Sequence, residues 1–183
     1  MMNSGAPVLI VLGITFGCAG FAGQPEYQVK AAYVYNFAKF VEWPATDSFS
    51  NVAVCIYGKD PFEGFLDQAV AGKLVHGLPI VVKRLSAVEE IWDQCQVVFL
   101  GSMSGARIQS ALSRVQGHSV VTIGESDSFA ETGGMIGLVV EHGRIQFDIN
   151  LAQVAAAHLK ISSRLVELGR VVTSQGRAKE SKK

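Results

Sequence analysis

The sequence has no excess of charge of either sign, because its 16 Lys and Arg residues balance 16 Asp and Glu residues over 183 positions. Such a chain has no long-range field that would draw in nucleic acid or acidic substrates. Only residues 174–183 have an excess of positive charge, and we expect them to form a flexible, solvated basic tail. No nucleic-acid partner is therefore predicted.

Arrangements that bind metals are also missing. The histidines have none of the spacings of metal-ligand pairs, such as His-x-x-x-His, and they stand at His76, His118, His142 and His158. We therefore predict no metal site.

Nucleophile and phosphate motifs are incomplete. The segment 101–105 resembles a nucleophile elbow, but its central residue is Met103 rather than Ser. Gly58-Lys59 lacks the upstream glycine of a P-loop, although a turn that binds a small anion there remains an alternative. The acidic residues Glu125, Asp127 and Glu131 are expected to form a solvated loop rather than an acid–base pair. No catalytic residue, no enzyme activity and no cofactor are predicted.

Residues 1–23 contain no charged side chain. Their apolar run is too short to cross a membrane, and small residues follow it, as in a secretory signal peptide. We predict a signal peptide over residues 1–22, with Gly20 and Ala22 before the cleavage site, and hence a periplasmic protein. The segment before Pro7 lacks the usual Lys or Arg. Lipidation at Cys18 and an uncleaved, buried leader remain the alternatives.

Cysteine is scarce: removal of Cys18 with the leader leaves Cys55 and Cys95. Two cysteines in an oxidising compartment are most simply a disulfide. Cys55 lies in the strand-like run 52–57, and Cys95 precedes the run 96–100, so the sulfurs could meet if these strands are neighbours. Two separate buried thiols are the alternative. A redox site is not expected, because the sequence has no Cys-x-x-Cys.

About 160 residues remain after the leader, enough for one domain, which we place at 23–173. Strand-like and helical segments alternate through its first part, which favours an α/β fold with a mainly parallel sheet and helices on both faces. The expected strands are 52–57, 79–84, 96–100 and 119–123, and the expected helices are 61–71, 86–92 and 104–115.

The C-terminal half has a different pattern. Two strands, 135–141 and 144–149, flank His142-Gly143, which is typical of an antiparallel hairpin. Helices are expected over 151–160 and 163–172. Asn150 is predicted to cap the first of these helices.

An amphipathic helix is predicted from Val29, ending at Trp43 before Pro44. Its predicted buried stripe consists of Val29, Tyr33, Phe37 and Phe40, with Val34 and Val41 alongside, and it excludes Lys30, Lys39 and Glu42. Asn36 is expected to bond inside the core, since an unpaired buried amide costs about 1–3 kcal/mol. For Asn36 and Asn150 a ligand pocket is the alternative. Trp43 is either buried or an interface anchor.

Four blocks carry a family resemblance: VKAAYVYNFAKFVEWP at 29–44, AVCIYGKDPF at 53–62, CQVVFL at 95–100, and FAETGGMIGLVVEHGRIQFDINLAQVAAAHLKISSRLVEL at 129–168. In this order they resemble the YfiR family of periplasmic regulators. The shared pattern includes Cys-x-x-Gly-x-Asp-Pro-Phe, a Gly-Gly-Met turn, and Phe-x-Ile-Asn-Leu before a helix. The motif residues, structural or at an interface, are Asn36, Trp43, Pro44, Gly58, Gly133, Gly134 and Asn150.

The resemblance implies a small periplasmic α/β protein without catalysis. It implies that the protein represses an inner-membrane diguanylate cyclase by contacting the cyclase's periplasmic domain, and that an outer-membrane lipoprotein can relieve the repression. Trp43 and the 151–168 helices are our candidate contact surfaces, and a homodimer is left open. No cysteine lies near Gly133-Gly134, so redox control through a second bridge is not implied. The alternative function is a periplasmic protein that binds a small anion or aromatic molecule.

Overall fold

The computed structural model describes residues 24–45, 49–174 and 176–177. The predicted signal peptide with Cys18, and most of the predicted basic tail, lie outside the described residues. In chain order the elements are α1 (Gln24–Phe40), β1 (Val41–Glu42), β2 (Val52–Tyr57), α2 (Phe65–Val70), β3 (Leu74–Val75), β4 (Leu78–Leu85), the 3-10 turn η1 (Val88–Glu90), α3 (Ile91–Gln94), β5 (Val97–Leu100), α4 (Gly105–Val115), β6 (Val121–Gly124), β7 (Ile136–Glu141), β8 (Arg144–Asn150), α5 (Leu151–Ala156), β9 (Lys160–Ile161), α6 (Ser163–Leu168), β10 (Arg170–Thr173) and β11 (Gly176–Arg177).

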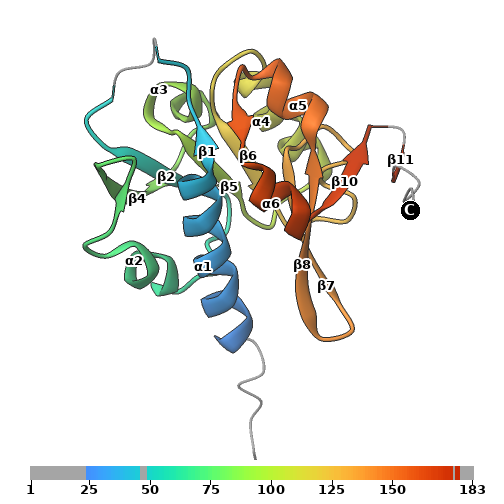
Figure 1. Cartoon of the computed structure of the whole chain (residues 1–183), viewed down its shortest axis with the longest axis horizontal. Helices are drawn as coiled ribbons and strands as arrows, with labels where there is room; N and C mark the ends of the chain where they lie inside the picture. Colours follow the sequence, from blue (N-terminus) through green and yellow to red (C-terminus); the bar gives the residue numbers. More distant parts are fainter. Residues whose placement is uncertain (1–23, 46–48, 175, 178–183) are drawn as a thin grey trace, which may run out of the picture.

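The central sheet has the strand order β11-β10-β8-β7-β6-β5-β2-β4-β3 (Figure 1). Strand β2 pairs in parallel with both β4 and β5, and β6 pairs in parallel with β5 and β7. Strands β7 and β8 form the antiparallel hairpin, whose turn residues His142 and Gly143 have φ values of 52° and 72°. The predicted fold, a mainly parallel sheet with a C-terminal hairpin, is confirmed.

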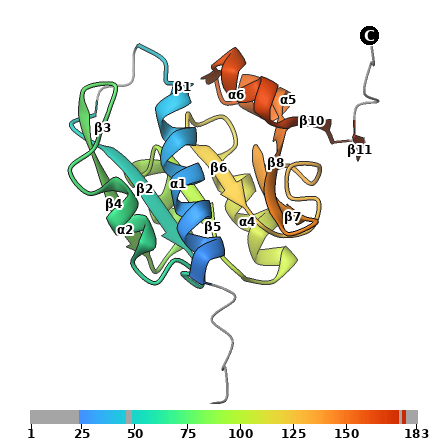
Figure 2. The ribbon, with the colours of Figure 1, turned by 60° about the horizontal axis from the view of Figure 1, so that its bottom comes forward.

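Helices cover both faces of this sheet, which explains why every residue of β2 is buried. Val54 and Ile56 pack with α1 and α2, whereas Ala53 and Cys55 pack with α3 and α4. Figure 2 shows α1 lying along one face and α4 on the other side of the strands. The sheet therefore separates two apolar clusters, and the larger one contains α1.

The buried face of α1 differs from the predicted stripe. Val34 and Phe37 are buried as expected, but Val29 is 47% exposed and Lys30 only 4% exposed. Asn36 is also exposed, so the expectation that its amide bonds within the core is wrong. The contact face of α1 runs through Ala31, Val34, Phe37 and Ala38, which are all buried, so the helix is rotated relative to the predicted stripe and Val29 lies outside the contact.

The first helix ends at Phe40, three residues earlier than predicted. Val41 and Glu42 instead form β1, which pairs antiparallel with β9. The carbonyl oxygen of Phe40 accepts a hydrogen bond from the Ser162 amide at 3.0 Å. A partner more than 100 residues away thus replaces the last helical turn with a strand, which the local sequence could not indicate.

The last predicted helix, 163–172, is also corrected. Helix α6 ends at Leu168, and Arg170–Thr173 forms β10, parallel to β8. A Cβ on Gly169 would lie 2.5 Å from the Phe147 ring, so glycine allows the close approach at this break. Arg170 donates to Asp148 at 2.7 Å and to Glu141 at 2.6 Å, which fixes the new strand against the hairpin. Helix α5 likewise ends at Ala156 instead of 160.

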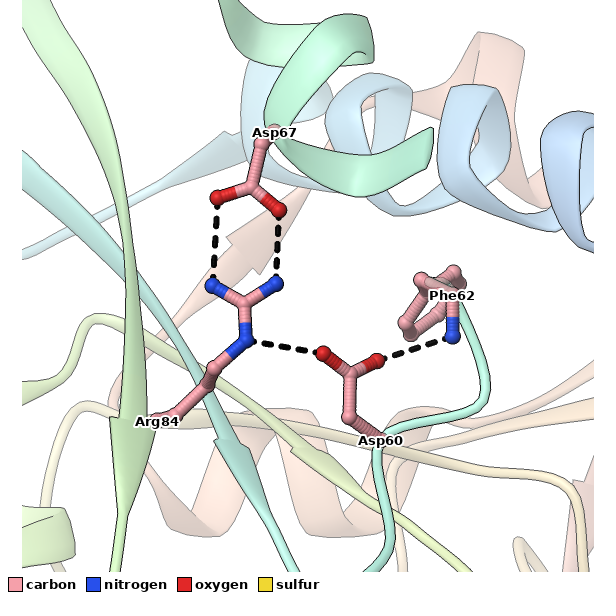
Figure 3. A network of polar contacts seen from close by, with 4 residues as sticks. All are labelled: Asp60, Phe62, Asp67 and Arg84. Carbon is pink, nitrogen blue, oxygen red and sulfur yellow. Dashed lines mark hydrogen bonds and ion pairs between the residues drawn. The ribbon is translucent and has the colours of Figure 1, made fainter. Parts of the chain in front are cut away.

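Asp60 caps a turn rather than a helix, because α2 begins at Phe65 and not at Pro61. Its carboxylate accepts from the Phe62 amide at 2.8 Å and from Arg84 Nε at 2.8 Å (Figure 3). Arg84 also makes a two-pronged contact with Asp67, at 3.1 and 2.6 Å. These hydrogen bonds from Arg84 lower the pKa of Asp67. The network ties α2 to the end of β4.

Candidate functional site

The end of the first family motif, Trp43-Pro44, forms one wall of an aromatic groove. The groove encloses a cavity of about 450 Å³, lined by Glu42, Trp43, Pro44, Ala45, Phe49, His76 and Leu78. The Trp43 ring meets Phe49 edge-on at 6.0 Å and His76 edge-on at 6.1 Å. Trp43 is half-buried, and its indole N–H is fully buried, without a hydrogen-bond partner among the described residues. The groove therefore presents mainly ring surfaces.

Two distant segments position these rings. Pro44 follows β1, whereas His76 occupies the tight turn between β3 and β4, where His76 and Gly77 have φ values of 51° and 82°. His76 Nε2 lies 2.7 Å from the carbonyl oxygen of Val41 and so joins the turn to β1. Leu74, in the same hairpin, is 56% exposed. This end of the molecule thus offers an apolar surface of the kind found at the centre of protein interfaces.

The structure brings the two candidate contact surfaces together. Strand β1, which leads into Trp43, pairs with β9, which lies between α5 and α6. Leu168 in α6 is 77% exposed. Trp43 therefore directly follows a strand that pairs with the middle of the 151–168 segment, at Lys160 and Ile161.

Cys55 and Cys95 form a disulfide whose Cα atoms are 5.8 Å apart. Both residues are buried in the cluster beneath α3 and α4, on the face of the sheet opposite α1. Their sulfurs are bonded to each other and buried, so they lack the solvent exposure that a reactive thiol needs. The disulfide is a structural link.

Three other motif residues meet around the start of the hairpin. Asn150 is fully buried; its Nδ2 donates to the Ala130 carbonyl at 2.7 Å, and its Oδ1 accepts from the Gln153 amide, capping α5 as predicted. Gly134 is buried against a phenyl ring, and a Cβ there would lie 2.1 Å from Phe129. Gly133 adopts φ +110°, where glycine is favoured. These residues hold the loop that enters β7.

Gly58 lies at a different place, where β2 ends. It has φ +96°, and a Cβ there would lie 2.4 Å from the Met103 side chain. The neighbouring Lys59 forms a β-bridge with Ser102, which follows β5. Gly58 therefore allows the loops after two adjacent strands to pack together. It is separate from the aromatic groove.

An ion cluster that the sequence did not reveal joins α1 to the loop after β6. The Lys30 ammonium lies 2.7 Å from Glu125 and 2.5 Å from Glu26, and Tyr27 OH donates to Glu125 at 3.2 Å. Burial opposes the charged form of Lys30, but hydrogen bonds to Glu125 and Glu26 outweigh it and raise the pKa of Lys30. Burial, and then the charge of Glu125, raise the pKa of Tyr27. Of these contacts, only the Glu26–Lys30 pair has a spacing in the sequence, four residues along a helix, that indicates an ion pair.

Among the described residues, no group of three or more His, Cys, Asp or Glu side chains is placed to hold a metal ion. Within the same part of the chain, no helix has both the length and the apolar character needed to cross a membrane.

A family model described as YfiR/HmsC-like matches residues 27–170. This chain belongs to the YfiR/HmsC-like family. The family consists of periplasmic regulators of cyclic di-GMP synthesis rather than of catalysts. The match begins within α1 and ends at the start of β10, so the YfiR/HmsC-like region contains the aromatic groove, the disulfide and all of the ion cluster except Glu26.

A solved structure has a similar fold. The ABC domain from Streptococcus pneumoniae in complex with L-Trp superposes with a TM-score of 0.52 at 10% sequence identity. The similarity covers 78% of this chain and 61% of that one, so this YfiR/HmsC-like chain spans about three fifths of the length of its structural neighbour. At this identity the likeness concerns the fold alone.

Proposed function

We propose that this protein is a periplasmic repressor that contacts the periplasmic domain of an inner-membrane diguanylate cyclase and keeps the enzyme inactive. The observation that carries this proposal is the YfiR/HmsC-like match, which extends over residues 27–170. A binder without chemistry can act only by preferring the inactive state of its target. Tenfold repression requires about 1.4 kcal/mol of differential binding.

The aromatic groove at Trp43 is our candidate for the centre of the contact. Aromatic side chains dominate the energetics of protein interfaces, and their pockets tend to lie near the middle of the contact. A partner side chain with an apolar body would fill the groove and pack against the Trp43 ring. The exposed Leu74 and the α5–α6 segment would extend the contact on either side.

The cellular test is deletion of the gene, with cyclic di-GMP measured by mass spectrometry. Deletion should raise cyclic di-GMP, and periplasmic expression of the wild-type domain should lower it again. Leu74→Asp should fail to restore repression, because it places a charge on the exposed surface of the β3–β4 hairpin, which forms one wall of the groove, and so opposes apolar contact. Val140→Asp, on the β7–β8 hairpin, is a matched control, since Val140 is 49% exposed and Leu74 is 56% exposed.

Unchanged cyclic di-GMP after deletion, together with pull-downs that recover no membrane enzyme, would refute the cyclase assignment. If the two Asp variants repressed the cyclase equally well, the contact surface would have to lie away from the groove. Relief of repression by an outer-membrane lipoprotein is part of the same proposal. It is tested by adding that lipoprotein to the purified repressor–cyclase complex and measuring cyclase activity.

A second candidate function is the binding of a small aromatic or anionic molecule. The observation that favours it is the cavity of about 450 Å³, whose lining includes the rings of Trp43, Phe49 and His76. The structural neighbour from S. pneumoniae was crystallised with L-Trp. Titration calorimetry with L-Trp separates the candidates: saturable binding without recovery of a cyclase favours the ligand, and the opposite result favours the repressor.

A further inference from the structure

Strand β4 lies at one edge of the sheet, and most of that edge is open (Figure 1). On one side, residues 80–85 pair with β2. On the other side, β3 pairs only with Leu78 and Pro79, so no strand in the described part of the chain lies beside residues 80–85. Every residue of β2 is buried, whereas Ile80 is the one fully buried residue of β4. The edge is therefore accessible to another chain.

One hydrogen bond shows which backbone groups face outward along this edge. The Ile80 amide donates at 3.4 Å to the carbonyl of Lys73, which leads into β3 on the side away from β2. The register with β2 is continuous over residues 80–85, and successive residues of a strand direct their N–H and C=O groups to alternate sides. Val82 and Arg84 therefore point outward as well. Among the described residues, neither has a backbone partner on that side.

A row of unpaired backbone groups can pair with a strand from another chain, a mode of recognition known as β-strand addition. A strand added here would bond to Val82 and Arg84 and would extend the nine-stranded sheet. Its side chains would continue the two faces of the sheet. Half-buried apolar residues lie on both faces of β4, Val82 on one and Val81 and Leu85 on the other. Apolar residues in the added strand therefore fit beside them.

The charges indicate which kind of strand fits. On the α1 side of the sheet, Arg84 is held by both Asp60 and Asp67, so a further carboxylate there would be repelled. On the other side, the Lys83 ammonium contacts only the Gln94 carbonyl, at 3.4 Å, and no ion pair among the described residues includes it. An acidic residue beside Lys83 would form a favourable cross-strand pair. A second copy would bring its own Lys83 and Arg84, and cations on an edge strand oppose pairing between identical chains.

We propose that the 80–85 edge of β4 binds an extended segment of a partner protein, in which one acidic residue is flanked by β-branched apolar residues. Backbone hydrogen bonds with Val82 and Arg84 supply the affinity, and the ion pair with Lys83 supplies the specificity. None of these three residues lines the aromatic groove, so this site and the groove proposed to contact the cyclase can be tested separately.

The test is an NMR titration of the ¹⁵N-labelled mature protein with the acetylated and amidated peptide Ser-Thr-Val-Glu-Val-Thr-Ser. Saturating peptide should slow hydrogen exchange of the Val82 and Arg84 amides at least tenfold. The Val81 and Lys83 amides, which face β2, should be protected already in the free protein. A peptide with Lys in place of Glu should bind at least fivefold more weakly. A peptide N-methylated along Val-Glu-Val cannot donate to β4 and should not bind.

Lys83→Glu should reverse the preference between the Glu and Lys peptides, and Lys83→Met should abolish it. Lys39→Glu makes the same change of charge at an exposed position on α1 and should alter each affinity less than twofold. Absence of binding by the Glu peptide overturns the proposal, as does equal binding of the N-methylated peptide. Protection of Val82 and Arg84 that grows with protein concentration, without peptide, would also overturn it, because a second copy would then occupy the edge.

Discussion

At the scale of single residues, Lys30 is the least expected feature of the molecule. A buried ammonium is costly unless it is paired and hydrogen-bonded. Lys30 meets this condition through Glu125, 95 positions away, and through Glu26, one helical turn away. The same contacts raise the pKa of Lys30, so the group stays charged across the physiological range. The cluster therefore fixes the first turns of α1 to the loop after β6.

The change Lys30→Met tests this role. It leaves Glu125 without its ammonium partner, and the free energy of unfolding should fall by about 1–3 kcal/mol, the usual cost of an unsatisfied buried polar group. Lys39→Met on the exposed side of the same helix is the control and should stay within about 0.5 kcal/mol of wild type. Urea unfolding followed by fluorescence measures both. Similar losses in the two variants would show that the Lys30 cluster contributes nothing specific.

At the scale of elements, the loop from Phe129 to Gly134 controls how the chain enters β7. The Phe129 ring is buried and lies against two glycines, Gly124 at the end of β6 and Gly134 before β7. A Cβ at either position would come within 2.5 Å of the ring. Asn150 closes the arrangement by donating to Ala130. The loop is thus held by close packing and by one buried amide.

The variant Gly134→Ala should lower the free energy of unfolding by about 1–3 kcal/mol, because the added methyl group overpacks the site beside Phe129. Gly105→Ala gives a matched comparison. Gly105 is the first residue of α4 and has no atom within 4 Å of the added Cβ, so this change should be neutral or stabilising by up to about 1 kcal/mol. Thermal and urea unfolding report both values. A neutral Gly134→Ala would mean that Phe129 can move aside.

At the scale of the whole molecule, the disulfide joins parts of the chain that are 40 residues apart. The loop that it closes contains α2, β3, β4 and α3. Cross-linking a loop of this size restricts the unfolded chain and stabilises the fold by roughly 4 kcal/mol in the chain-entropy model. The disulfide thus constrains the half of the sheet that carries the β3–β4 wall of the aromatic groove.

Cys55→Ser should therefore lower the free energy of unfolding by about 2–5 kcal/mol. Cys95→Ser and reduction of the wild-type protein should produce comparable losses, because each breaks the same link. Thiol labelling of denatured, unreduced protein from the periplasm should find no free thiol at either position. Full labelling of both cysteines in that material would refute the disulfide in the exported protein.

Much of the fold could be predicted from local patterns. The alternation of apolar runs with capped helical segments indicated the parallel sheet and its two helical layers, and His142-Gly143 indicated the hairpin. Helix α4, with Ser104 before it, lies where it was expected. Local signals sufficed there, because the periodicity of burial and the chemistry of turns act over a few neighbouring residues.

Local sequence patterns were sufficient for the class of fold and the order of most elements, and the residues alone carry the family motifs. Tertiary contacts decided the rest: Val41–Glu42 became a strand through β9, and Arg170–Thr173 became a strand through β8. They also buried Lys30 beside Glu125 and brought His76 to Trp43. The physical reason is the same in each case. The interactions that stabilise these conformations involve partners far along the chain, so local propensities cannot predict them.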